Sequence, residues 1–412
     1  MGDFSQNSIS SMQHIASFVV PHRFQNKVQS ATSHPCAVVA IIPSFKPGPL
    51  TVKLVSDLLR WNDELCIYVV DDCTPESYEH EYAYFASIAK MSDRVTLLRT
   101  PVNKMKAGAI NYALFSMRDA GVRPDIILTL DDDVVVDRNT VKALVHGVLS
   151  DERIGAACSQ CRVLNKNANF LTRLQGLEYL GFNATRLADE GFFYGPLVMH
   201  GMLTAFRADV LYAVGGFKEG HLIEDYEITS RIKSLGWHVR LAPHAYAWTE
   251  VPARFSHLWR QRTRWVYGGV TVVSEMKFAP GIIQDIIGHV MFVGTLFLII
   301  VSYMFAERGV MSHVIFQCII ALSLAQVILW YSFQLWLMKF YADKDRIDWL
   351  LRISLVPEFI YANLLTLVLL GSYLFWLFNV VSVSIPDTSF MRGLRKMFLK
   401  VGYTKGWGTR SG

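Results

Sequence analysis

Three long stretches without Asp, Glu, Lys or Arg occupy the C-terminal third of this 412-residue chain and limit the folds open to it. They run from Ile286 to Phe305, from Val310 to Met338 and from Phe359 to about Val383. Each is long enough to cross a hydrocarbon layer of ~30 Å as a helix. The sequence therefore predicts a helical transmembrane region behind a larger soluble part. The net charge of +5 is modest and comes without a long basic run, which argues against nucleic acid as a partner.

Basic residues on both sides of the third stretch predict the side of the membrane on which its ends lie. Lys339, Lys344, Arg346 and Arg352 precede it, and a basic tail follows it. The positive-inside rule places both segments in the cytosol, whereas three crossings would place the tail outside. We expect an even number of crossings and a cytosolic tail, because Pro357 and Glu358 break the stretch from Trp349 onward, so that the chain either dips into the membrane and returns or splits into two short membrane segments. The number of crossings stays open.

In the soluble half, short apolar runs end at acidic residues. Leu65–Val70 leads to Asp71 and Asp72, and Asp125–Leu130 leads to Asp131. A further β-branched run, Ala37–Ile42, is separated from Leu65–Val70 by a helical pattern around 50–59, so we predict an α/β domain with a mostly parallel sheet. Because ligands bind at the carboxyl ends of such strands, a nucleotide site is expected there.

Three adjacent carboxylates, Asp131, Asp132 and Asp133, repel one another unless a cation or hydrogen-bond donors face them. Asp131 and Asp133 can point the same way and hold Mg²⁺ or Mn²⁺ with a diphosphate. Lys106, close to a glycine, is either a second ligand contact or an ordinary solvated helix start.

A second acidic pair, Glu224 and Asp225, precedes a helical pattern. A carboxylate there is either a helix cap or a general base facing an acceptor hydroxyl. Further on, Phe255–Val273 mixes aromatic residues with arginines, as in a helix that lies along the cytosolic membrane surface.

Taken in order, these residues resemble family 2 glycosyltransferases, in the branch of membrane-integrated polysaccharide synthases that make cellulose, chitin, hyaluronan or poly-N-acetylglucosamine. The resemblance implies a GT-A type nucleotide-sugar-binding domain followed by transmembrane helices. The resemblance implies that Asp71 and Asp72 contact the uridine and that Lys106, in a Lys-x-Gly-Ala-x-Asn segment, contacts the nucleotide. It implies that Asp131 and Asp133 hold the metal and the diphosphate, and that Asp225, beside Glu224, is the base. Contacts with the acceptor and the diphosphate are implied for Gln261, Arg262, Arg264 and Trp265.

Two features leave the sugar open. The base segment, Glu224 to Glu227, favours the glucan or poly-N-acetylglucosamine side, whereas Trp407 and Arg410 lie in a Trp-Gly-Thr-Arg segment that resembles a possible gating motif of the hyaluronan branch. The implied reaction is inverting transfer from a UDP-sugar, UDP-GlcNAc or UDP-Glc, to a growing β-linked glycan beside the lipid bilayer. Alternatives are a two-donor, hyaluronan-type synthase and nonprocessive transfer to a polyprenyl phosphate.

The resemblance and the apolar stretches together predict a multi-pass membrane protein with a cytosolic catalytic domain. Its expected segments are a polar N-terminal segment at 1–34, the GT-A domain at 35–253, an amphipathic interfacial helix at 254–280, transmembrane helices at 281–385 and a basic cytosolic tail at 386–412. The Cys158 and Cys161 pair has no second pair to complete a zinc site, so buried thiols are expected.

Overall fold

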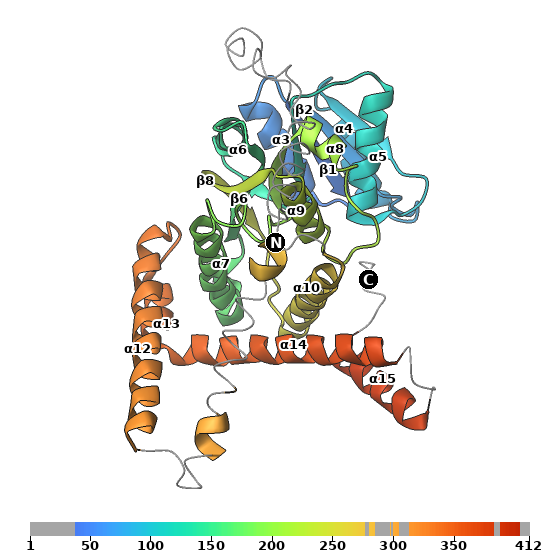
Figure 1. Ribbon diagram of the computed structural model, residues 1–412. Helices are drawn as coiled ribbons and strands as arrows, with labels where there is room; N and C mark the ends of the chain where they lie inside the picture. Colours follow the sequence, from blue (N-terminus) through green and yellow to red (C-terminus); the bar gives the residue numbers. More distant parts are fainter. Residues whose placement is uncertain are drawn as a thin grey trace, which may run out of the picture.

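A mixed eight-stranded sheet forms the centre of the protein in the computed structural model, which describes residues 38–276, 280–284, 297, 300–304, 313–382 and 388–403 (Figure 1). The strand order is β3-β2-β1-β4-β7-β6-β8-β5. In this sheet order, the four strands from β3 to β4 pair in parallel. β7 runs antiparallel to both of its neighbours, and β6 pairs with β8 in parallel. The strands are β1 Val38–Ser44, β2 Cys66–Asp71, β3 Val95–Arg99, β4 Ile126–Leu130, β5 Val135–Val136, β6 Ile154–Val163, β7 Leu203–Arg207 and β8 His238–Thr249.

Helices cover both faces of this sheet and so bury the β-branched runs of β1 and β4 on both sides. One apolar layer packs under α3, α4 and α6, and the other under α5, α8 and α9. The helices of this domain are α3 Pro49–Trp61, α4 Glu79–Ala89, α5 Met105–Asp119, α6 Thr140–Leu149, α7 Phe170–Ala188, α8 Ala208–Ala213, α9 Glu224–Ser234 and α10 Phe255–Glu275. The predicted α/β class and the three predicted strands are confirmed.

After α10 come α12 His313–Leu337, α13 Arg346–Ser354, α14 Val356–Val381 and α15 Ser389–Val401, and residues 280–284 and 300–304 are also helical. By length and composition, Ile320–Phe340 and Val356–Val381 could each cross a membrane. They correspond to the second and third apolar stretches. The segment 1–34 and most of the stretch 286–305 lie outside the described residues. The predicted break before the last stretch falls at Leu355, whose φ is 59°, with Pro357 in the first turn of α14.

A largely buried ion-pair network joins the start of α13 to the α/β domain. Asp348, whose side chain is fully buried, accepts from Lys166 Nζ at 2.7 Å and from Arg173 Nη1 at 3.0 Å. Asp345 caps α13 by accepting from the backbone N–H groups of Ile347 and Asp348, and it also pairs with Arg173 at 2.7 Å. Asp345 is 38% exposed, whereas Lys166 and Arg173 are largely buried, so removing Asp348 leaves two buried cations with only a partly solvated carboxylate.

We predict that Asp348→Ala lowers the free energy of unfolding by about 3 to 5 kcal/mol, the usual effect of breaking a buried ion pair. The matched control is Lys53→Ala, which removes the exposed member of an i,i+4 pair with Asp57 and should cost only about 0.3 to 0.5 kcal/mol. Denaturant unfolding of detergent-purified protein, followed by tryptophan fluorescence, measures both. Equal losses would contradict the network's contribution.

Candidate active site

The two aspartates at the end of β2 are buried and already hydrogen-bonded within the domain. Asp71 accepts from the backbone N–H of Thr74 at 2.8 Å and pairs with Arg99 at 3.1 Å. Asp72 accepts from Thr100 Oγ1 at 3.0 Å and from the N–H of Lys104 at 2.8 Å. Burial raises the pKa of Asp72 despite these donors. Both carboxylates therefore lie at the carboxyl edge of the sheet, as predicted, and order the loops around them.

Three of the six non-glycine residues with positive φ in the described chain lie at the same edge. Lys46, Cys73 and Met105 have φ of 57°, 58° and 61°, in the left-handed region that side chains rarely adopt. Lys46 follows β1, Cys73 follows β2, and Met105 begins α5. Such strain concentrates at ligand sites, where neighbouring contacts hold the backbone in place. The ammonium of Lys46 also lies 4.0 Å from the ring centroid of Tyr78 and donates to its hydroxyl, a contact that sequence reasoning missed.

Lys106, on the first turn of α5, is the centre of the site. Its Nζ lies 2.6 Å from Asp131 Oδ1, 3.3 Å from Glu224 Oε1 and 2.7 Å from the carbonyl oxygen of Gly201. Burial alone would lower the pKa of Lys106, but the carboxylates of Asp131 and Glu224 outweigh burial and raise it. The lysine is therefore charged. It lies between two acidic motifs, at Asp131 and Glu224, that are 93 residues apart in the sequence.

The predicted base, Asp225, lies at the N-terminus of α9 in this cluster. Its Oδ2 accepts from the N–H of Gly201 at 2.9 Å, and its Oδ1 accepts from the N–H of Tyr226 at 2.8 Å. Burial, with the charge of Glu224 second, raises the pKa of Asp225 to about 6. A carboxylate with a pKa near the working pH is suited to accept a proton, so the geometry permits the base role as well as that of a cap.

The three consecutive aspartates alternate in burial. Asp132 is buried and accepts from Ser44 Oγ at 2.6 Å, whereas Asp131 and Asp133 are both partly exposed. Within the described ranges no three His, Cys, Asp or Glu side chains are grouped to hold a metal ion. Two carboxylates fit Mg²⁺ or Mn²⁺ when substrate phosphates complete the oxygen shell.

The arginines of α10 point to different partners. Arg262 is buried and forms a two-point contact with Glu178 of α7, at 3.2 and 2.6 Å, while its guanidinium lies 4.1 Å from the Trp265 ring centroid. Arg264 instead donates to the carbonyl of Leu222, two residues before Glu224, at 3.1 Å. Arg264 therefore lies next to the acidic cluster, whereas Arg262 links α10 to α7.

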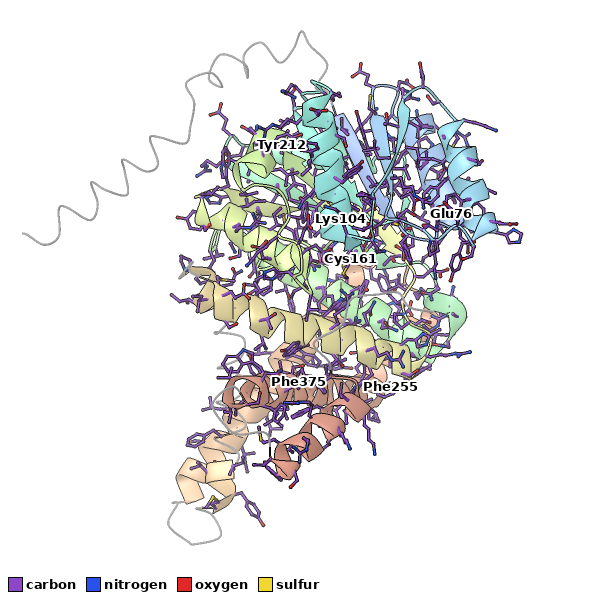
Figure 2. The ribbon with its side chains drawn as sticks, turned by 90° about the vertical axis from the view of Figure 1, so that its right-hand side faces the viewer. Glu76, Lys104, Cys161, Tyr212, Phe255 and Phe375 are labelled. Carbon is purple, nitrogen blue, oxygen red and sulfur yellow. The ribbon has the colours of Figure 1, made fainter. Side chains whose placement is uncertain are left out.

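The remaining predicted residues are Gln261, the pair Cys158 and Cys161, and Trp407 with Arg410. Gln261 accepts from Arg262 at 2.7 Å. Trp407 and Arg410 lie outside the described residues. Cys158 and Cys161 are buried in different apolar layers, on opposite faces of the sheet, and Figure 2 labels Cys161 inside the domain. Burial raises the pKa of the Cys158 thiol to about 11, as expected for an inert side chain.

Residues 126–380 match the family described as glycosyl transferase family group 2. The chain belongs to this family. It is therefore a glycosyltransferase, and the family inferred from its motifs is confirmed. Together with the mixed sheet, this membership confirms the expected GT-A type domain.

Relatives in this family are distant. The chain is 28% identical over 297 residues to a probable glycosyltransferase, YdaM, of Bacillus subtilis, covering 71% of this chain and 67% of the relative. It is 25% identical over 177 residues to the poly-β-1,6-N-acetyl-D-glucosamine synthase of Staphylococcus aureus, so the match spans 42% of that synthase.

Similar solved structures include a Pyrobaculum calidifontis mannosyltransferase in complex with GDP-Man and Mn²⁺, with 19% identity, a TM-score of 0.49 and coverage of 81% of this chain and 99% of that one. Glucosyl-3-phosphoglycerate synthase of Mycobacterium tuberculosis, solved with Mn²⁺ and UDP, has 15% identity and a TM-score of 0.41, covering 59% of this chain and 81% of that one.

We predict that turnover falls as the pH drops below about 6, because protonated Asp225 cannot accept a proton. Glu224→Gln removes the neighbouring charge that raises this pKa, so the acid limb should move to lower pH even if the rate drops. Release of the nucleotide product at saturating donor, measured across the pH range in both proteins, tests this. An acid limb that does not move would show that another group controls it.

We predict that Glu178→Gln reduces stability by about 3 to 5 kcal/mol, since it leaves Arg262 buried without its counter-charge. It should leave the donor KM unchanged, whereas Arg264→Gln should raise that KM. Unfolding curves and donor titrations on the same preparations separate the two effects. A raised donor KM in Glu178→Gln would instead support the predicted contact between Arg262 and the diphosphate.

Proposed function

We propose that this protein is a membrane-bound, inverting glycosyltransferase that polymerises a β-linked polysaccharide from a UDP-sugar, with UDP-GlcNAc or UDP-Glc as donor. The observation that carries the proposal is the cluster around Lys106, in which Asp131, Glu224 and the Gly201 carbonyl meet one ammonium beside the candidate base. The poly-β-1,6-N-acetyl-D-glucosamine synthase among its relatives favours a polymer product. Apolar α12 and α14 favour membrane attachment.

In the proposed reaction, an acceptor hydroxyl attacks the anomeric carbon as the bond to the diphosphate breaks. Asp225 takes the hydroxyl proton, and the nucleoside diphosphate leaves with the bonding electrons. Attack opposite the leaving group converts an α-linked donor into a β-linked product. The Asp225 carboxylate is held by two backbone N–H groups, so it is positioned before substrate binds.

The departing diphosphate requires positive charge, which this chain offers from Lys106 and Arg264. Asp131 and Asp133 would hold Mg²⁺ or Mn²⁺ through their oxygens, and such an ion supplies further charge stabilisation to the leaving group. Asp71 and Asp72 are assigned to the uridine end. Trp265, with one face under Arg262, and Gln261 are assigned to the acceptor side.

We predict that Asp225→Asn lowers the rate of UDP release by at least ~100-fold, the scale of lost general-base catalysis, while UDP binding is retained. The matched control is Asp119→Asn, at an exposed helix end, which should be fully active. Detergent-purified protein is given single UDP-sugars and pairs with Mg²⁺ or Mn²⁺, and product size is followed on a gel.

A long product from one donor would support the homopolymer synthase, and a need for two donors would point to a hyaluronan-type enzyme. Short, lipid-linked products would replace the proposal with nonprocessive transfer to a polyprenyl phosphate. Full activity of Asp225→Asn would reject the assigned base.

A further inference from the structure

We infer that α14 lies in the plane of the cytosolic membrane surface instead of crossing the bilayer, with α15 beside it on anionic lipid head groups. The inference rests on the proposed function only in taking the catalytic domain as cytosolic. It concerns a helix that is apolar enough to span, so composition alone points the other way.

Both ends of α14 are bound to the catalytic domain. Near its start, Tyr361 Oη donates to Glu178 Oε2 on α7 at 2.7 Å; near its end, Asn379 Nδ2 donates to Tyr267 Oη on α10 at 3.1 Å. Eighteen residues of helix separate these contacts, about 27 Å. That length is close to the whole hydrocarbon thickness of ~30 Å.

A crossing helix would place these two contacts on opposite sides of the bilayer. That arrangement conflicts with the catalytic domain, because α7 and α10 are joined directly by the Glu178 and Arg262 pair. Tyr267 is also next to Gly268, where an added Cβ would lie 3.0 Å from Ile223, the residue before Glu224. Both ends of α14 therefore lie on the side of the active site.

The direction of α14 differs from that of α12. Figure 1 shows α14 lying crosswise beneath the catalytic domain, while α12 runs along the molecule and past the level of α14. Figure 2 labels Phe255 of α10 and Phe375 of α14 at the level where the domain meets these helices. Two crosswise helices cannot both follow the membrane normal. Of the two, α12 suits lipid better, because Leu322 and Leu324, on different faces, are 71% and 58% exposed and little of the apolar segment Ile320–Phe340 is buried.

α14 presents one apolar stripe away from the protein. Ile360, Leu367, Leu374 and Val381, spaced by seven residues, are all exposed, whereas the residues that follow the first three of them, Tyr361, Val368 and Phe375, are buried. A helix covered by protein along one face and apolar along the other matches burial in the outer edge of a bilayer.

α15 continues this surface and adds charge. Phe398 packs on Phe375 and Phe378 with ring centroids 5.1 and 5.2 Å away, which fixes α15 to α14. Phe390, Met397 and Val401 form an exposed apolar edge. Away from this edge lie the exposed cations Arg392, Arg395 and Lys396, with Lys400 at its border, and Ser389–Val401 contains no carboxylate. Basic amphipathic helices of this kind bind anionic lipid surfaces.

The arrangement also resolves the conflict between three apolar stretches and a basic tail. With α14 in the plane, two of the three crossings predicted from the sequence remain, and the tail at 386–412 returns to the cytosolic side that its charge favours.

The test measures the membrane depth of nitroxide labels on the full chain in phosphatidylcholine and phosphatidylglycerol vesicles. Single cysteines at Ile360, Leu367, Leu374 and Val381, in a background without native cysteines, are labelled and their accessibility to oxygen and to a nickel chelate is compared. We expect four depths that agree within one helical turn, about 5 Å. Deep values at Leu367 and Leu374 with shallow ends, over about 30 Å, would overturn the inference.

Labels on α12 at Leu322, Leu329 and Trp336 provide the spanning profile for comparison. For α15, a label at Met397 should move outward when phosphatidylglycerol is omitted, and should not respond to that lipid in the Arg395→Gln, Lys396→Gln, Lys400→Gln variant. A label that ignores lipid charge in the parent protein would reject the head-group contact.

UDP release is measured on the same vesicles to separate the two proposals. Active protein with a spanning α14 profile rejects the in-plane helix alone. Equal depths in a protein that forms no glycosidic product leave α14 in the plane and reject the proposed polymerase alone.

Discussion

Repulsion among the carboxylates at one edge of the sheet is the constraint on which the active site depends. Asp131 and Glu224 come from separate motifs, and without a cation between them their charges would oppose the packing of α9 against the sheet. Lys106 supplies that cation and is itself fixed by the Gly201 carbonyl. The same ammonium is the positive charge that the proposed reaction assigns to the departing diphosphate.

A second set of buried charges connects this site to the C-terminal helices. Glu178 receives Arg262 from α10 and Tyr361 from α14, so three helices share one carboxylate. On α10, Arg262 faces these helices while Arg264, two residues later, contacts the loop before Glu224. α10 is thus in contact with both the C-terminal helices and the acidic cluster of the candidate site.

Much of the fold could be predicted from sequence because its signals are local. Apolar runs that end in aspartate gave β2 and β4, and uncharged stretches gave α12 and α14. The site residues of α9 and α10 could be named because each motif is short and chemically distinctive. Their spatial grouping around Lys106 depends on the sheet order, which no local pattern encodes.

Other features required coordinates. The identity of the Arg262 partner was hidden because Glu178 lies 84 residues earlier on a helix with no unusual composition. Hydropathy likewise identified α14 as apolar without its direction, since direction depends on what each end contacts. The positive φ angles at Lys46, Cys73 and Met105 could not be predicted either, because the sequence signal for such a backbone is glycine and none of the three is glycine.

Gly201 has a consequence beyond its two hydrogen bonds. A Cβ at this position would lie 2.6 Å from Lys106 Nζ and 3.4 Å from Asp225 Oδ2. The lysine end is flexible, so steric relief is easy, yet any relief draws the ammonium away from the oxygens that neutralise it. A Gly201→Ala substitution adds no charge, yet by displacing the Lys106 ammonium it would change the electrostatic potential at the acidic cluster.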